Sequence, residues 1–364
     1  MSNVDYVKSK SGDNPSFADV PTAMTFSVVA GMALHRGPIS GIDASPDGGR
    51  LLLSNYGDDS VSVIRTGSWA EVNAVAGINE PFAIAISGAD PGHAYVNAVS
   101  PAYDGIAVID LESNSVVASH PVDLTVTDLA VSPDGRHVYV SRVAATGADV
   151  AVLETATGRV EPIDIAASAG SSTECVRVTP DGRRLYVAVQ RPSGGEVVAI
   201  DTHLRRVIDT VDIGWAIRDV AISPDGRTAY VVSNGADFGV VVDVIDTHTN
   251  KVTVTRKLSE TGGLVTQLKL SGDGDRAYLV GDDRVAVMCT STYDVIGAVT
   301  VGGQPSCVAE SPDGKYLYVA DYSGAVTVIS IASPTASLTE TEGEHTAPLE
   351  QRTREFPQLE PALT

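Results

Sequence analysis

The chain has few of the residues and segments that usually reveal a function. It holds three cysteines, Cys175, Cys289 and Cys307, and their odd number and wide spacing argue against a disulfide framework or a structural zinc site. It has no apolar run near the roughly 18–20 residues that a spanning helix requires, so we expect no membrane partner. Its first residues carry no apolar stretch of the secretory type. The sequence as written therefore predicts a cytoplasmic protein, unless an export signal has been removed from it.

Positive charge is also scarce. The 364 residues contain 25 Lys and Arg against 46 Asp and Glu, which gives a formal net charge of −21 at pH 7. Binding to a phosphate backbone requires clustered Lys and Arg, so a nucleic-acid partner is not expected. An acidic surface of this kind is most simply explained as a source of solubility.

Familiar catalytic and cofactor motifs are absent as well. The sequence has no GxSxG elbow, no HExxH pair, no GxxxxGK[ST] loop and no GxGxxG after a predicted strand. None of its seven histidines pairs with another at metal-ligand spacing. We therefore predict no cofactor and no metal site, and motifs alone assign no reaction.

What the chain does contain is a short turn motif that recurs seven times. Successive copies start 42, 45, 47, 44, 48 and 40 residues apart. The copies read SPDG at 45–48, 132–135, 223–226 and 311–314, TPDG at 179–182, SGDG at 271–274 and, in a stretched form, SGADPG at 87–92. A repeat of this length with four strand-like segments is typical of a β-propeller blade. The sequence therefore predicts an all-β fold, a seven-bladed β-propeller of four-stranded blades.

One repeat illustrates how the residues produce a blade. Residues 219–223 alternate bulky and small side chains with the period of a strand. Pro224, Asp225 and Gly226 then turn the chain, because proline fixes φ, aspartate accepts backbone hydrogen bonds and glycine takes a positive φ. Three further strands are predicted over 228–232, 240–246 and 251–257, where valine and other β-formers dominate.

Two segments carry a family resemblance. Residues 303–314 read GQPSCVAESPDG and are followed by YVAD, and residues 54–64 read SNYGDDSVSVI. They resemble the repeat unit of the YVTN family of seven-bladed propellers, over about residues 24–332. The resemblance implies the fold, and for function it implies a range that includes binding proteins, secreted surface proteins and lactonase-like enzymes. At least one similar propeller is thought to bind single-stranded DNA, a role that the acidic charge disfavours here. The WD dipeptide and the Kelch double glycine do not recur.

The number of strand-like segments in each repeat also predicts how the ring closes. The last repeat contains only three such segments, whereas residues 24–30 form another one before the first repeat. We expect this N-terminal strand to complete the last blade, which removes an exposed edge. The chain then divides into an N-terminal arm (1–23), the propeller (24–332) and an acidic C-terminal tail (333–364), whose Pro, Thr and Glu content predicts disorder.

Candidate site residues come from the innermost strands, because propellers usually bind ligands at one end of the central channel. Each strand can be aligned on the Ser or Thr of its turn motif. Five residues before it stand Ser40, Phe82, Thr127, Glu174, Arg218, Thr266 and Ser306. Four before it stand Gly41, Ala83, Asp128, Cys175, Asp219, Gln267 and Cys307. Two before it stand Asp43, Ala85, Ala130, Arg177, Ala221, Lys269 and Ala309. The charged members depart from the small or apolar residues of the other repeats.

Two interpretations of these charges remain open. In the structural one they pair across adjacent blades, Arg177 with Asp219 or Asp128 and Lys269 with Asp219. In the functional one Arg218 and Arg36 hold a carboxylate or phosphate, and Glu174 is an acceptor or base. Glu174 and Arg218 occupy the same slot, by which we mean the same position relative to the turn motif, in adjacent blades. We therefore expect their side chains to approach each other. The candidate ligand-binding residues are Glu174, Arg218, Asp219, Arg177, Asp128, His35, Arg36, Asn55, Asn97, Arg142, Arg191, Asp321 and Tyr322.

Two functions are compatible with this pattern. The first is a monomeric binding or scaffold propeller that recognises a small anionic molecule or a protein partner at the channel mouth. The second is a lactonase-like hydrolase, with Glu174 or Asp128 as base and Arg218 beside the carbonyl oxygen. A divalent-metal version would need Asp128, Asp219 and Glu174 to converge, and the neighbouring arginines would weaken its affinity for the metal.

Overall fold

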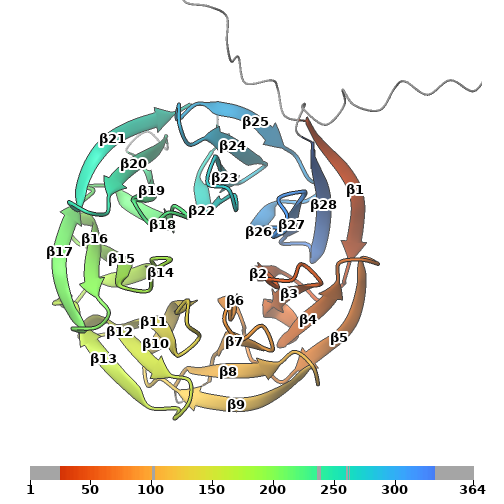
Figure 1. Ribbon diagram of the computed structural model, residues 1–364, viewed down its shortest axis with the longest axis horizontal. Coiled ribbons are helices and arrows are strands. Elements are labelled where there is room, and N and C mark those ends of the chain that lie inside the picture. Colours follow the sequence, from red (N-terminus) through yellow and green to blue (C-terminus); the bar gives the residue numbers. More distant parts are fainter. Residues whose placement is uncertain (1–24, 101–102, 236–238, 260, 262, 333–364) are drawn as a thin grey trace, which may run out of the picture.

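The computed structural model describes residues 25–100, 103–235, 239–259, 261 and 263–332. Their strands form seven four-stranded antiparallel sheets arranged as the blades of a ring (Figure 1). The predicted fold is therefore confirmed. The expected N-terminal arm and acidic tail lie outside the described residues. The 3-10 turn Tyr56–Asp58 is the one helical element described, so no helix there is long enough to cross a membrane.

Each blade is listed from its innermost to its outermost strand. Blades 1 to 3 comprise β2 (Ile39–Ala44), β3 (Arg50–Asn55), β4 (Ser60–Arg65) and β5 (Ala70–Ala76); β6 (Ile84–Ile86), β7 (His93–Ala98), β8 (Gly105–Asp110) and β9 (Ser115–Pro121); and β10 (Thr125–Val131), β11 (His137–Ala144), β12 (Gly147–Glu154) and β13 (Val160–Asp164). Blades 4 and 5 comprise β14 (Ser172–Val178), β15 (Arg184–Arg191), β16 (Gly194–Asp201) and β17 (Arg206–Asp212); and β18 (Ala216–Ile222), β19 (Thr228–Asn234), β20 (Val240–Asp246) and β21 (Lys251–Leu258). Blades 6 and 7 comprise β22 (Val265–Leu270), β23 (Arg276–Gly281), β24 (Val285–Cys289) and β25 (Val295–Val299); and β26 (Pro305–Glu310), β27 (Tyr316–Asp321), β28 (Ala325–Ala332) and β1 (Thr25–Ala33).

The repeated turn works as its residue types predict. In the third blade the Ser132 hydroxyl donates to Asp134 Oδ1 at 2.6 Å and accepts the His137 N–H at 3.0 Å. Gly135 has φ of 70° and donates its N–H to Ser132 O at 2.8 Å. The serine hydroxyl lowers the pKa of Asp134 below its usual 3.8. This closed set of local hydrogen bonds explains why Ser or Thr, Asp and Gly recur at each turn.

The ring closes through β1, as expected. This strand pairs antiparallel with β28 from Thr25–Ala332 to Ala33–Ala325, with one bulge between Val28 and Ala30. It therefore extends three residues beyond the predicted end at residue 30. In Figure 1 the first and last strands of the propeller lie side by side in one blade. Residues from both ends of the chain thus share one sheet.

The hydrophobic core lies between the blades and not on the ring axis. Each buried apolar cluster joins two neighbouring blades, as where Leu53 and Ile64 of blade 1 pack with Tyr318 and Val328 of blade 7. Because the faces of the sheets bury one another, the inner edges of the blades surround a channel that polar side chains can occupy.

Candidate functional site in the central channel

The channel contains a cavity of about 670 Å³. The innermost strands of all seven blades contribute to its wall, and Tyr322 on the β27–β28 loop lies at one mouth. The mouth at the start of the innermost strands carries the residues that stand five positions before the turn motif. The other end of the cavity reaches Pro224 and Ser271 of the turns.

A β-bulge at the mouth lets two consecutive residues face the cavity. Strand pairing in blade 5 skips from Ile217 to Asp219, so Arg218 has no partner on β19. Arg218 and Asp219 both line the cavity, although an unbulged strand would point one of them away. The same skip occurs in six of the seven blades, and the unpaired residues are Ser40, Thr127, Glu174, Arg218, Thr266 and Ser306.

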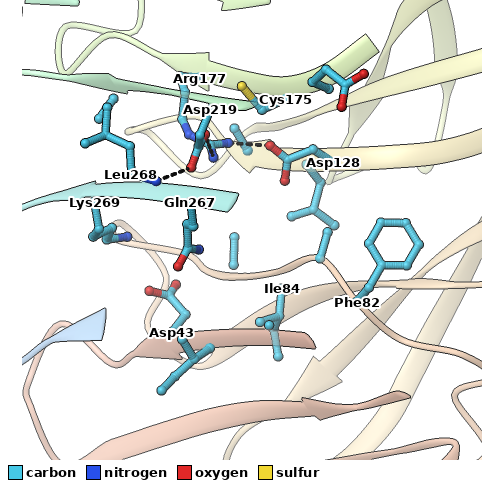
Figure 2. A pocket seen from close by; sticks show the side chains of 18 of the residues that line it. Asp43, Phe82, Ile84, Asp128, Cys175, Arg177, Asp219, Gln267, Leu268 and Lys269 are labelled. Carbon is cyan, nitrogen blue, oxygen red and sulfur yellow. Dashed lines mark hydrogen bonds and ion pairs between the residues drawn. The ribbon is translucent and has the colours of Figure 1, made fainter. Parts of the chain in front are cut away.

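Three charged side chains of the wall form a closed cluster. Arg177 on β14 lies between Asp128 of blade 3 and Asp219 of blade 5, and its Nη2 is 2.6 Å from Asp219 Oδ1 (Figure 2). Arg177 Nε donates to Val220 O at 2.9 Å. The carboxylates also accept backbone N–H groups, Asp219 from Leu268 at 2.9 Å and Asp128 from Val176 at 3.1 Å. The structural interpretation is thus correct for Arg177, Asp128 and Asp219.

The same cluster bears on the partner of Lys269 and on whether Asp128 and Asp219 suit a divalent cation. Lys269 does not pair with Asp219, because Arg177 and Leu268 N–H already occupy that carboxylate. Lys269 interacts electrostatically with Asp43, whose pKa is raised by burial and lowered in part by the lysine. Both oxygens of Asp219 and Oδ2 of Asp128 are engaged by Arg177 and by backbone donors, and this shared cation disfavours a divalent cation between the two carboxylates. No group of three His, Cys, Asp or Glu side chains in the described part of the chain is placed to hold a metal ion.

Glu174 and Arg218 remain at the mouth outside this cluster. Arg218 is exposed to the cavity and makes no ion pair or hydrogen bond with any described residue. Glu174 is half-buried and accepts one hydrogen bond, at 3.3 Å from Ser172 Oγ. Burial raises the pKa of Glu174 above 4.5, and Arg218 offsets this only in part. The two side chains influence each other as expected, but they do not form the direct pair that their shared slot suggested.

Burial favours the thiol form of the cysteine in the wall. Burial raises the pKa of the Cys175 thiol well above 9.0. The thiolate is the reactive form of cysteine, and it is not populated at neutral pH under these conditions.

Seven predicted site residues do not line the cavity. Among them the arginines are each neutralised nearby, because a carboxylate follows on an adjacent strand or loop: Arg36 contacts Asp58 and Glu71, Arg142 contacts Asp149, and Arg191 contacts Glu196. The other four are His35, Asn55, Asn97 and Asp321. His35 is exposed and has φ of 56°. The remaining three make hydrogen bonds nearby: the Asn55 side chain donates to Ser60 and Ser62, and the side chains of Asn97 and Asp321 accept backbone N–H groups of Phe82 and Ala83, and of Ser323 and Ala325. Five of the seven residues lie on the second strands of their blades, one strand outward from the channel, and His35 and Arg36 lie between β1 and β2. The structure therefore does not bring these seven residues together with the cavity wall.

Two features of the site were not predicted from the sequence. Gln267 Oε1 accepts the Val308 N–H at 2.9 Å, so it joins blade 6 to blade 7 as Asp219 joins blade 5 to blade 6. Their common slot, four residues before the turn motif, was the signal that could have revealed this role. The second feature is Phe82, an aromatic residue at a slot where most other repeats carry Ser or Thr.

Comparison with known proteins places the chain among propellers. Residues 94–214 match the family described as "Lactonase, 7-bladed beta-propeller". The chain is 50% identical over 343 residues to "Seven-bladed beta-propeller protein Rv1057" of Mycobacterium tuberculosis, and the match covers 86% of this chain and 87% of that protein. A solved structure of Kuenenia stuttgartiensis hydrazine synthase superposes with a TM-score of 0.74 at 24% identity, covering 82% of this chain and 97% of the other. At that identity the hydrazine synthase likeness concerns the fold alone.

Proposed function

Because the chain belongs to the lactonase-like family of seven-bladed β-propeller proteins, we propose that it binds a small anionic molecule at the channel mouth. Arg218 carries this proposal. It is an exposed guanidinium on a bulge, it faces a cavity of about 670 Å³, and no described carboxylate neutralises it directly. A guanidinium in that state suits bidentate recognition of a carboxylate or phosphate.

A thermal-shift screen tests this function. Wild type and Arg218→Ala would be screened against carboxylates and sugar phosphates in buffer free of both. Arg227→Ala is the matched control, because Arg227 belongs to the same blade but lies at its opposite end with a side chain 86% exposed. We expect an anion to stabilise wild type and Arg227→Ala but not Arg218→Ala. If every stabilising anion acts equally on all three proteins, the mouth is not the binding site.

Lactone hydrolysis is the second candidate, and the match to the lactonase family over 94–214 favours it. That segment contains Glu174, whose raised pKa suits a general base working nearer neutral pH. Arg218 would then stabilise the developing negative charge on the carbonyl oxygen. A panel of small lactones would be tested with wild type, Glu174→Gln and Arg227→Ala. Hydrolysis lost only in Glu174→Gln supports an enzyme, whereas no turnover by wild type leaves the binding function.

A further inference from the structure

We propose that the channel mouth selects a carboxylate that carries an aromatic body, with the carboxylate at Arg218 and the ring against Phe82. This inference rests on the proposed function and names the class of ligand for the same site.

The cavity wall is divided between polar and apolar blades. Its charged side chains come from blades 3 to 6, apart from Asp43, whose oxygens accept the Ile86 and Ala44 N–H groups. Blade 2 contributes no charge and presents Phe82, Ile84 and Ala85 instead. Figure 2 shows Phe82 and Ile84 on the opposite side of the cavity from Arg177 and Asp219. A ligand that fills this cavity meets hydrocarbon at blade 2, and ionic groups at blades 3 to 6 and at Asp43 of blade 1.

The backbone that bears Phe82 is held in a distinct way. β6 is the shortest innermost strand and starts only at Ile84, so the chain before it lacks strand pairing. The buried Asn97 side chain replaces that pairing, because its Oδ1 accepts the N–H groups of Phe82 and Ala83, each at 2.7 Å. Asn97 N–H in turn donates to Ala83 O at 3.2 Å. The phenyl ring is therefore presented from a fixed backbone, which lowers the entropy cost of binding against it.

Phe82 packs in part against the apolar cluster between blades 2 and 3, and it also lines the cavity. At the same slot Ser40 donates to Pro81 O at 2.8 Å, and Thr127 hydrogen-bonds Thr173 at 2.8 Å, so those side chains join neighbouring segments. A phenyl ring makes no such bond, and Phe82 is only partly buried while lining the cavity. An aromatic ring left partly open at a channel mouth is a favourable surface for another apolar group.

The positions of Arg218 and Phe82 define the polarity of the ligand from one end to the other. They hold equivalent slots in blades 5 and 2, which lie three blades apart in a ring of seven and therefore on opposite sides of the mouth. Arg177 is already engaged by Asp128 and Asp219, and Lys269 lies further along the channel beside Asp43. Among the described residues of the mouth, one unpaired cation opposite one aromatic ring fits a single carboxylate with an apolar body better than a dianion.

Calorimetric titration of the full chain with phenylacetate, acetate and neutral phenylacetamide tests the inference. We expect phenylacetate to bind at least about tenfold more tightly than acetate, since the ring buries apolar surface, and phenylacetamide to bind weakly. Phe82→Ala should weaken phenylacetate about tenfold and leave acetate unchanged, whereas Arg218→Ala should abolish binding of both. Tyr103→Ala is the control, because Tyr103 is an exposed aromatic of the same blade that does not line the cavity.

The outcomes distinguish failure of this inference from failure of the proposed function. Equal affinity for phenylacetate and acetate, both dependent on Arg218, overturns the inference and leaves the proposed function standing. The same holds if Phe82→Ala binds phenylacetate as wild type does. If no carboxylate shows Arg218-dependent binding, the proposed function fails and this inference with it. If Phe82→Ala does not fold, Phe82→Thr replaces it, because blades 3 and 6 carry threonine at this slot.

Discussion

Neighbouring charges in the channel differ in what they contribute to folding. The side chain of Arg177 is 28% exposed and serves two carboxylates, of which Asp219 is only 4% exposed. Arg218, one blade away, is exposed and makes no ion pair or hydrogen bond with any described residue. Of these two arginines, Arg177 on blade 4 thus joins blades 3 and 5, whereas Arg218 makes no such link with the described residues.

Arg177→Ala should be strongly destabilising. It leaves the carboxylates of Asp128 and Asp219 without their shared cation, and removing one partner of a largely buried ion pair costs about 3–5 kcal/mol. Arg218→Ala should change the free energy of unfolding by less than about 1 kcal/mol, as for exposed charges. Urea denaturation of both variants measures the difference. Equal losses of stability would contradict the assignment of these two roles.

Glu174 should make stability depend on pH. Burial raises its pKa above 4.5, so the folded state binds this proton more tightly than the unfolded state. The contribution of Glu174 to the free energy of unfolding is therefore most favourable at low pH and declines as pH rises from 4.5 through the raised pKa.

Glu174→Gln removes this titration and serves as the reference. The stability of wild type relative to Glu174→Gln should rise as pH is lowered from neutral toward 4.5, as measured by urea denaturation at a series of pH values. A difference that is constant across that range, or that falls with decreasing pH, would show that the carboxyl is not desolvated.

At the scale of the strands, a single slot links neighbouring blades. The residue four positions before the turn motif accepts an N–H from the innermost strand of the next blade at three seams: Asp128 to Val176, Asp219 to Leu268 and Gln267 to Val308. These bonds run between sheets, where no strand pairing exists. Residues at this slot therefore fix the position of one blade relative to the next along the channel axis.

Gln267→Ala isolates one of these links without removing a charge. It leaves the Val308 N–H without its acceptor at the seam between blades 6 and 7, and we expect a loss of about 1–3 kcal/mol. Gln267→Asp supplies the acceptor that blades 3 and 5 use at this slot and should lose less. Chemical denaturation compares the two variants. An alanine variant as stable as wild type would mean that water satisfies this N–H.

For the whole molecule, closure depends on two segments at opposite ends of the sequence. β1 is the outermost strand of blade 7 and pairs with β28 along its length. Deleting it exposes the edge of β28 and detaches the start of the chain from the last blade.

A chain that begins at residue 34 should therefore lose cooperative unfolding and melt at a lower temperature than wild type. A chain that begins at residue 25 keeps all of β1 and is the matched control. Calorimetry would compare the three proteins. A melting transition of the shorter chain that matches wild type would show that the ring does not depend on this strand.

The fold was more predictable from sequence than the site for a physical reason. The turn motif is local, because Ser132, Asp134 and Gly135 bond within six residues, so its recurrence identifies every blade. Alignment of the innermost strands also placed Arg177 between its two acidic neighbours. The outer candidates do not reach the cavity wall, and their cross-strand partners could not be seen in the sequence pattern, as with Arg142, which lies opposite Asp149 in the same hairpin. Phe82 was overlooked because its position depends on Asn97, a contact that no repeat pattern predicts.

The bulges at the mouth have a consequence for how such proteins diverge. A bulge residue has no partner in the strand ladder, so mutation can exchange it with little penalty to the ring. Natural selection therefore has six such positions, in all blades but the second, on which to vary chemistry while the scaffold is inherited unchanged. Lineages that share this ring can drift apart in what they recognise faster than in how they fold, and their specificities are best compared one mouth position at a time.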